Sequence, residues 1–121
     1  QRSEMTKVIT FEHRGIRAAI PANQALDVVH SSEAPEGVEK LWSGPLDSGG
    51  RWLRVRAARG ECWLSCKAVQ LREVADAALT PVSPLLAGVL KLPYVVGIAS
   101  IEDQATWLVD MTRFGARLSL E

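Results

Sequence analysis

The chain has 121 residues, and its 14 Lys plus Arg balance its 14 Asp plus Glu, so the formal net charge is zero at pH 7. This length suits one domain with one sizeable core. The balanced charge removes the long-range positive field on which phosphate-backbone binding depends, so nucleic acid is not an expected partner. No run approaches the roughly 18 apolar residues of a membrane span, and the start lacks the apolar centre of a signal peptide. We therefore expect no membrane partner and a cytoplasmic location.

Two hydrophobic runs near the start predict a β-hairpin. Residues 8–11 and 16–20 are apolar, β-branched or alternating, and Arg14-Gly15 between them supplies a residue that tolerates positive φ. Pro21 ends the second strand because it cannot donate a hydrogen bond to a ladder. Residues 22–29 then predict a short helix or turn, since helical spacing relates their apolar members Ala25, Leu26 and Val29.

The same order of elements follows further along the chain. Residues 52–57 predict a strand, Arg59-Gly60 a turn, 62–66 the returning strand, and 68–74 a short amphipathic helical segment. This order indicates a duplicated unit and hence two similar subdomains. A shift of 45 residues superposes three elements of the first unit on the second, namely Arg14-Gly15 on Arg59-Gly60, Leu26 on Leu71, and Val29 on Val74.

The remaining segments connect or close these units. Residues 31–50 are rich in Ser, Gly, Pro and acids with a few apolar residues, so we expect a loop with a short anchored piece. Residues 80–84 form a proline-punctuated connector. A hairpin that occurs only once is predicted from strands at 94–100 and 105–110, with Glu102-Asp103-Gln104 in its turn.

The two cysteines, Cys62 and Cys66, lie four residues apart in a predicted strand. A strand rises about 3.3 Å per residue, which separates them by roughly 13 Å. A disulfide needs Cα atoms within about 7 Å of each other. We therefore expect two free thiols. The residues before Met5 and the terminal Leu120-Glu121 resemble additions at the chain ends and carry no functional argument.

Residues with catalytic or metal-binding chemistry are sparse. The run Asp47-Ser48-Gly49-Gly50 resembles the nucleophile motif of trypsin-like proteases, but the chain is too short for their two barrels, so a polar turn is expected. His13 and His30 stand at no metal-ligand spacing, and His13 is expected to be exposed at a hairpin tip. The sequence contains no Gly-rich phosphate loop and no Gly-x-Ser-x-Gly elbow. We expect no active site, no cofactor and no metal.

Aromatic and basic residues are the remaining candidates for binding. Tryptophans serve either as core or as interface anchors. Trp107 lies in a predicted apolar strand and is expected in the core, whereas Trp42 lies in the loop-like stretch, where either role is open. Arg54 and Arg56 share one face of a predicted strand, which is either its solvated side or a site for an acidic partner.

Three segments resemble, in this order, the CheW family of bacterial chemosensory couplers. Residues 51–73, RWLRVRAARGECWLSCKAVQLRE, are similar to the family's strand, Gly turn, strand and short helical segment. Residues 92–114, LPYVVGIASIEDQATWLVDMTRF, resemble its closing hairpin, and residues 11–29, FEHRGIRAAIPANQALDVV, resemble its opening unit. The resemblance implies a mainly β fold of two intertwined β-barrels, with a hydrophobic groove between them and no active site.

The resemblance also implies what is missing. It gives a single domain over residues 5–121, with a truncated first subdomain at 5–50 and a second subdomain at 51–118. A full member has a second closing hairpin where this chain has only residues 34–50. Family members bridge the cytoplasmic tip of a chemoreceptor to a CheA-like histidine kinase, and the missing part contributes to the kinase contact. The chain thus resembles the shortened CheW-like component of the Frizzy pathway of gliding bacteria, binding the receptor with kinase binding weak or absent.

The resemblance places the receptor groove on the exit of the first unit and on the closing hairpin. The alternative for each candidate residue is barrel core, which we expect for about half of them, and the exposed ones should form an apolar patch. Two other functions stay open: a small β-barrel that recognises a peptide or nucleotide, and an enzyme with a dispersed site. The groove candidates are Leu26, Val28, Val29, Val95, Val96 and Ile98.

Overall fold

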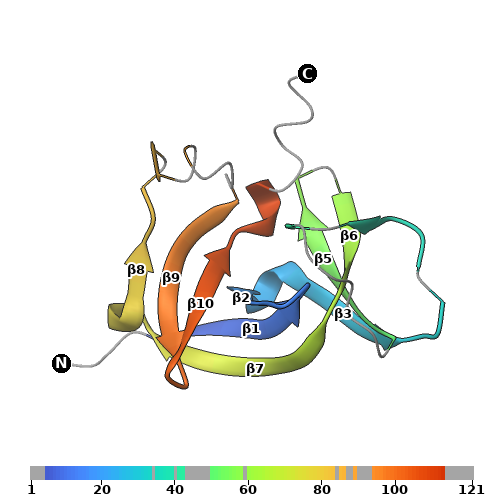
Figure 1. Cartoon of the computed structure of the whole chain (residues 1–121), viewed down its shortest axis with the longest axis horizontal. Helices are drawn as coiled ribbons and strands as arrows, with labels where there is room; N and C mark the ends of the chain where they lie inside the picture. Colours follow the sequence, from blue (N-terminus) through green and yellow to red (C-terminus); the bar gives the residue numbers. More distant parts are fainter. Residues whose placement is uncertain are drawn as a thin grey trace.

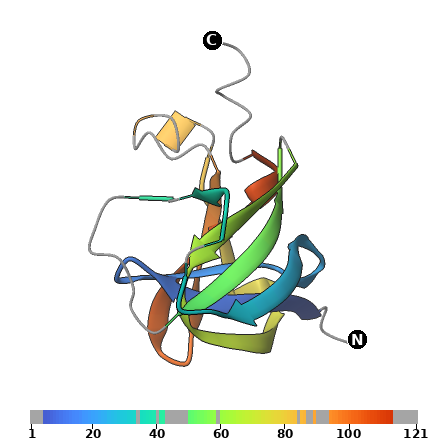
Figure 2. The ribbon, with the colours of Figure 1, turned by 90° about the vertical axis from the view of Figure 1, so that its right-hand side faces the viewer.

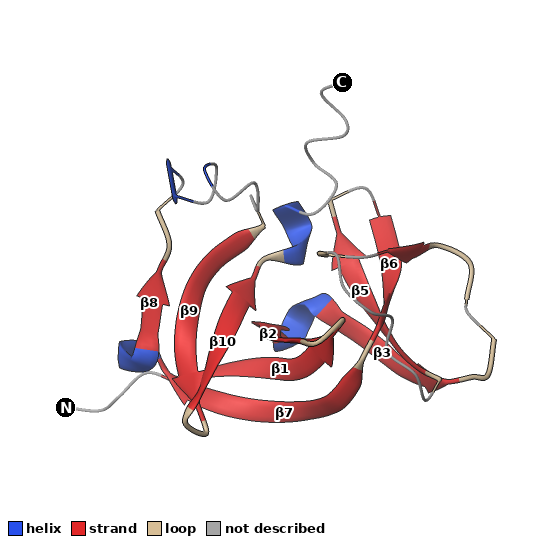
Figure 3. Ribbon diagram, viewed as in Figure 1, coloured by secondary structure: helices blue, strands red, loops and turns tan. Residues whose placement is uncertain are grey.

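A computed structural model describes residues 5–33, 35–39, 41–42, 50–58, 60–83, 85–86, 89 and 94–113. These residues are mainly β, as predicted, with short 3₁₀ turns between strands (Figures 1 and 3). The elements in chain order are β1 Met5–His13, β2 Ile16–Pro21, η1 Ala22–Gln24, β3 Ala25–His30, β4 Val38–Glu39, β5 Arg51–Ala57, β6 Gly60–Ser65, β7 Lys67–Ala75, η2 Asp76–Ala78, β8 Leu79–Pro81, β9 Val95–Ile101, β10 Gln104–Val109 and η3 Met111–Arg113.

The strands form two sheets. The larger has the order β7-β1-β2-β10-β9-β8, and the smaller has the order β3-β5-β6-β4. Only the three residues of η2 join β7 to β8, so the two edges of the larger sheet lie close together and the sheet curls (Figure 1). Figure 2 brings the smaller sheet to the front. Each sheet combines strands from both predicted subdomains: β1 and β2 join β7 to β10, and β3 and β4 join β5 and β6. None of the described helices is long and apolar enough to cross a membrane.

The predicted repeat is present in the strand pairing. Ala18 of β2 pairs in parallel with Trp107 of β10. Trp63 of β6, 45 residues after Ala18, pairs in parallel with Val38 of β4. The order β7-β1-β2-β10 therefore matches β3-β5-β6-β4, and β4 is the counterpart of β10. Each unit keeps its hairpin in one sheet and sends its third strand into the other sheet, which intertwines the two halves.

The repeat does not keep the predicted shift of 45 residues in its third strand. Val29 pairs with Trp52 in β5, and Leu71 pairs with Ile9 in the equivalent strand β1. Leu71 is thus the counterpart of Val29, and the superposition of Leu26 on Leu71 is wrong. The reason is η1, whose three residues separate β2 from β3, while Cys66 alone separates β6 from β7.

Two predicted helical segments are strands instead. Residues 22–29 form the single turn η1 and then β3, and residues 68–74 belong to β7. Each new strand pairs with a distant hairpin, β3 with β5 and β7 with β1. Apolar residues in so short a window fit both periods, and tertiary pairing then decides between them. The other predicted strands lie within a few residues of β1, β2, β5, β6, β9 and β10.

Glycines turn both hairpins at positive φ, as predicted. Arg14 at φ 53° and Gly15 at φ 85° form the two-residue turn between β1 and β2. Gly60 at φ 125° pairs with Ala57 and so begins the returning strand β6. Arg59 of the predicted turn, the run 47–49 and the chain ends lie outside the described residues.

The core has two parts. A smaller cluster lies within the larger sheet and contains Val8, Ala19, Val74, Ala99 and Ile101. The main cluster joins the two sheets, with Trp107 packed against it as expected. Because the main cluster draws side chains from both sheets, neither sheet buries its apolar face by itself. The members of the main cluster are Phe11, Ala18, Ile20, Leu41, Leu53, Val55, Cys62, Leu64, Cys66, Tyr94, Val95, Val109 and Met111.

Candidate partner-binding surfaces

The six predicted groove residues divide into two groups on different sheets. Leu26, Val28 and Val29 lie on β3, at an edge of the smaller sheet, and the other three lie on β9 in the larger sheet. The two strands lie apart in both views (Figures 1 and 2). Val95 is 1 % exposed and belongs to the main core. The exposed members are Val28 at 41 % and Ile98 at 37 %, while Leu26, Val29 and Val96 are half-buried.

β3 is an edge strand of the smaller sheet, and a side chain occupies one of its backbone donors. The Val28 N–H donates to Oδ1 of Asp27 at 2.9 Å, which occupies one donor of the strand. A charged side chain at this position disfavours addition of a foreign strand. A partner is therefore expected to contact side chains of β3 such as Val28, and not to add a strand to its backbone.

A further exposed apolar residue, Leu71, escaped the sequence reasoning. It is 62 % exposed on β7 and is the counterpart of Val29 on β3. The sequence predicts a short amphipathic helical segment at residues 68–74, with Leu71 considered only as the counterpart of Leu26. Along β7 only Val74 is fully buried, so the exposure of Leu71 became evident only once the segment was known to be a strand at the edge of the larger sheet.

The connector after β8 carries another exposed apolar group, and the sequence reasoning missed it too. Leu85 is 80 % exposed, Leu86 48 % and Val89 71 %. The Val82 N–H donates to the Val96 carbonyl at 2.9 Å, so this connector starts beside Val96 of the predicted groove. The signal in the sequence was the Leu85-Leu86 pair followed by Val89, a run that lies between the predicted connector at 80–84 and the predicted strand at 94–100 and received no interpretation.

The two arginines singled out on β5 lie on the outer face of the smaller sheet. The Arg54 guanidinium lies over the Trp63 ring, 5.9 Å from its centroid, and its Nη1 is 2.8 Å from Oε1 of Glu61. Arg56 is exposed on the same face, opposite Glu61. Arg54 therefore already has an acidic partner within the sheet.

His13 is fully buried, so the prediction of an exposed hairpin tip is wrong. The end of β1 is covered by the end of β6 and by residues 41 and 42. The ring Nδ1 lies 2.5 Å from the Ser65 carbonyl, and the Leu41 N–H donates to Nε2 at 3.3 Å. The Tyr94 hydroxyl donates to the Leu41 carbonyl, and burial raises the pKa of Tyr94 to about 12.

Trp42 faces the core side of this cluster. Its Nε1 donates to the His13 carbonyl at 2.7 Å, and its ring meets the imidazole edge-on, with centroids 6.0 Å apart at 64°. The ring also lies against Tyr94, with centroids 6.4 Å apart. Trp42 could have served in the core or as an interface anchor. These contacts favour the core, because they hold the residue against the main cluster.

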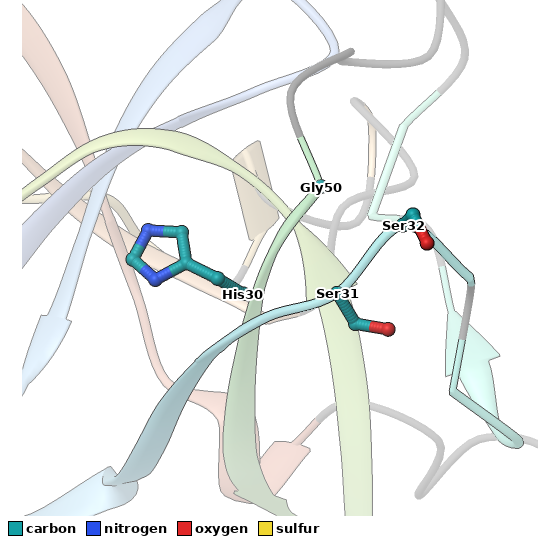
Figure 4. A pocket seen from close by; sticks show the side chains of 4 residues that line it. All are labelled: His30, Ser31, Ser32 and Gly50. Carbon is teal, nitrogen blue, oxygen red and sulfur yellow. The ribbon is translucent and has the colours of Figure 1, made fainter.

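A shallow pocket lies where β3 leaves the smaller sheet. It measures about 540 Å³, is open to solvent, and is lined by His30, Ser31, Ser32 and Gly50 (Figure 4). The His30 ring points away from both serine hydroxyls, so no nucleophile and base pair forms among them. The described part of the chain holds no group of three or more metal-binding side chains.

Comparison with known proteins identifies the fold. No protein-family model matches the sequence, and no curated protein matches it. The scaffolding protein TtCheW from Thermoanaerobacter tengcongensis has a similar solved structure, with a TM-score of 0.57 and 17 % identity over 88 % of this chain and 89 % of that chain. The fold is therefore CheW-like, as the resemblance implied: it is mainly β, and the described strands form one sheet of six and one of four.

Proposed function

We propose that this chain is a non-catalytic, cytoplasmic adaptor of a bacterial chemosensory or motility pathway. The single observation that carries the proposal is the CheW-like fold, since the similar solved structure is that of a scaffolding protein. One domain over residues 5–121 agrees with a main core that draws on both sheets. The output of such a protein is binding free energy, concentrated in a few apolar anchors.

We propose further that the partner is the cytoplasmic tip of a chemoreceptor and that kinase binding is weak or absent. Between β7 and β10 the larger sheet gains β8 and β9, whereas only residues 31–37 separate β3 from β4. Among the described residues, the smaller sheet thus contains no counterpart of these two strands. A standard interface needs about 800 Å² from each partner, so the loss of two strands removes much of one. This shortening supports a role like that of the Frizzy component.

The receptor surface is proposed on the two exposed members of the predicted groove, Val28 and Ile98, together with the half-buried Val96. Val28 on β3 and Val96 with Ile98 on β9 offer apolar surface on strands that are backed by the core. Rigid strands hold such anchors with little loss of conformational entropy on binding. Val95 contributes by packing beneath its neighbours, because it is buried.

Titration calorimetry against a receptor tip, and separately against a kinase regulatory domain, tests the proposal. We expect measurable receptor binding that Val28→Glu and Val96→Glu each weaken, and little or no kinase binding. Leu71→Glu is the matched control, because it places the same charge on an exposed strand residue outside the predicted groove. Absence of receptor binding would remove the adaptor function, and tight kinase binding would contradict the reduced contact. An equal loss in the control would contradict the groove.

The second candidate function is a small peptide- or nucleotide-binding module, and the observation that favours it is the pocket at His30. Arg51 Nε donates to His30 Nε2 at 3.0 Å, which places a guanidinium beside a ring that lines the pocket. Such groups suit an anionic ligand. Saturable binding of a nucleotide in the same calorimeter, abolished by Arg51→Gln, would favour this function over the adaptor.

A further inference from the structure

The hydrogen bonds of His13 define its protonation state. The Leu41 backbone N–H can only donate and the Ser65 carbonyl can only accept. Because Leu41 donates to Nε2 at 3.3 Å, Nε2 has to carry the lone pair. The proton then belongs to Nδ1, which donates to the Ser65 carbonyl at 2.5 Å. The neutral imidazole with its proton on Nδ1 satisfies both contacts at once.

This imidazole fastens Leu41 and Trp42, which follow β4. Leu41 is 5 % exposed and belongs to the main core, and Trp42 packs against that core. Three hydrogen bonds hold the pair: Leu41 N–H to the imidazole, Trp42 Nε1–H to the His13 carbonyl, and the Tyr94 hydroxyl to the Leu41 carbonyl. Two of the three involve His13, one through its ring and one through its backbone carbonyl, so the bond to the Leu41 N–H is the one that responds to the state of the imidazole.

A second proton on the ring is incompatible with this arrangement. Protonation turns Nε2 into a donor that faces the Leu41 N–H, and it places a positive charge where His13 is fully buried. Titratable groups close to the ring in the chain are Glu12 on β1, Arg14 in the turn after it, Cys66 beside Ser65, and Tyr94. The Tyr94 hydroxyl keeps its proton, since burial raises its pKa to about 12, and the Cys66 thiol contacts the Arg51 carbonyl.

We infer that His13 is a proton-sensitive latch, which holds Leu41 and Trp42 against the core when neutral and releases them when protonated. The inference goes beyond the adaptor role, because it supplies a conformational change that acid controls. The latched state cannot take the proton and the released state can, so the released population rises as pH falls. Below the ordinary histidine pKa of about 6.5, this population grows about tenfold for each pH unit. Release uncovers apolar surface on both residues.

NMR on the whole protein tests the latch, with controls that the chain itself provides. Imidazole ¹⁵N shifts should show the proton of His13 on Nδ1. The indole N–H of Trp42 should lose protection from exchange relative to that of Trp52, which donates to the Ser31 carbonyl at 3.1 Å and has no histidine partner. We expect the ratio of the two protection factors to fall about tenfold for each pH unit below about 6.5.

Two results would overturn the latch: a His13 proton on Nε2, or protonation of His13 with no change in the Trp42 to Trp52 ratio. The variant His13→Gln supplies an amide that does not titrate, and it should abolish the pH dependence of that ratio. His30→Gln should leave the dependence intact. If His13→Gln does not fold, the titration of the unmodified protein and of His30→Gln still decides the inference.

Discussion

Trp63 stands on β6 where Ala18 stands on β2, yet the two have opposite surroundings. Ala18 is fully buried opposite Phe11 in the main core. Trp63 is half-buried opposite Arg54, whose guanidinium lies over its ring. The equivalent faces of two duplicated sheets have therefore diverged, one sealed by apolar packing and the other turned outward under a charged side chain.

This relationship predicts opposite tolerance at the two equivalent positions. Ala18→Leu should lower the free energy of unfolding by about 1–3 kcal/mol, because it overpacks a closed core. Trp63→Leu should lower it by only about 0.5–1 kcal/mol, the contribution of an exposed cation–π contact. Urea denaturation of both variants measures the difference. Equal losses would show that the two faces are buried alike.

Gln24 should stabilise the end of β10 with both atoms of its amide. Its Nε2 donates to Oδ1 of Asp110 at 2.9 Å, and its Oε1 accepts from the Met111 N–H at 2.8 Å. Gln24→Ala should lower the free energy of unfolding by about 1–2 kcal/mol, since it leaves partly buried groups without partners. Gln24→Glu is the control that keeps the acceptor but places a negative charge beside Asp110. Thermal denaturation that ranks Gln24→Ala equal to the unmodified protein would contradict this role.

Asp110 should make stability sensitive to acid. Burial alone would raise its pKa, but hydrogen bonds from Thr112 and Gln24, together with the Arg113 charge, hold the pKa of this carboxyl below its ordinary value. The lowered pKa means that the stabilisation is complete above the unfolded value of about 3.9 and is lost as pH falls through the folded value. Asp110→Asn should flatten the decline in unfolding free energy below about pH 4. An unchanged pH profile would assign the decline to other groups.

Glycine substitutions at the two positions of the turn between β9 and β10 should change the melting temperature differently. Glu102 and Asp103 have φ of 55° and 62°, a region that costs a non-glycine residue about 1 kcal/mol. Asp103→Gly should therefore raise the melting temperature slightly. Glu102→Gly should not, because the Glu102 carboxylate lies 3.3 Å from Arg17 and 2.8 Å from Arg72. A larger gain from Glu102→Gly would show that these ion pairs contribute nothing.

The two thiols should be unreactive in the folded protein. Neither Cys62 nor Cys66 forms a disulfide, and both are buried. Burial, with a smaller effect of Glu39, raises the pKa of Cys62 to about 11. Because the thiolate is the reactive form, we expect slow alkylation at pH 8 and labelling of both residues in denaturant without reductant. Mass spectrometry follows the labelling. No labelling, with a mass lower by two hydrogens, would demonstrate a disulfide.

Local chemistry in the sequence determined the mainly β class, the hairpin turns at Gly15 and Gly60, and the order of the repeated elements. Alternating apolar residues and turn glycines act within a few residues of each other, so these features can be recognised without a fold. The likeness to CheW was visible for the same reason, since it rests on the order of three such segments.

Only the tertiary structure decided which segments form the third strand of each unit, the strand that pairs with the other unit's hairpin. β3 and β7 have apolar spacing that also fits a helix, and only their pairing with β5 and β1, far away in sequence, makes them strands. A contact between other distant segments places Leu41 against the buried His13. The strand pairing also divides the six groove residues between two sheets. Backbone groups in a strand need hydrogen-bond partners from another segment, and a sequence does not name that partner.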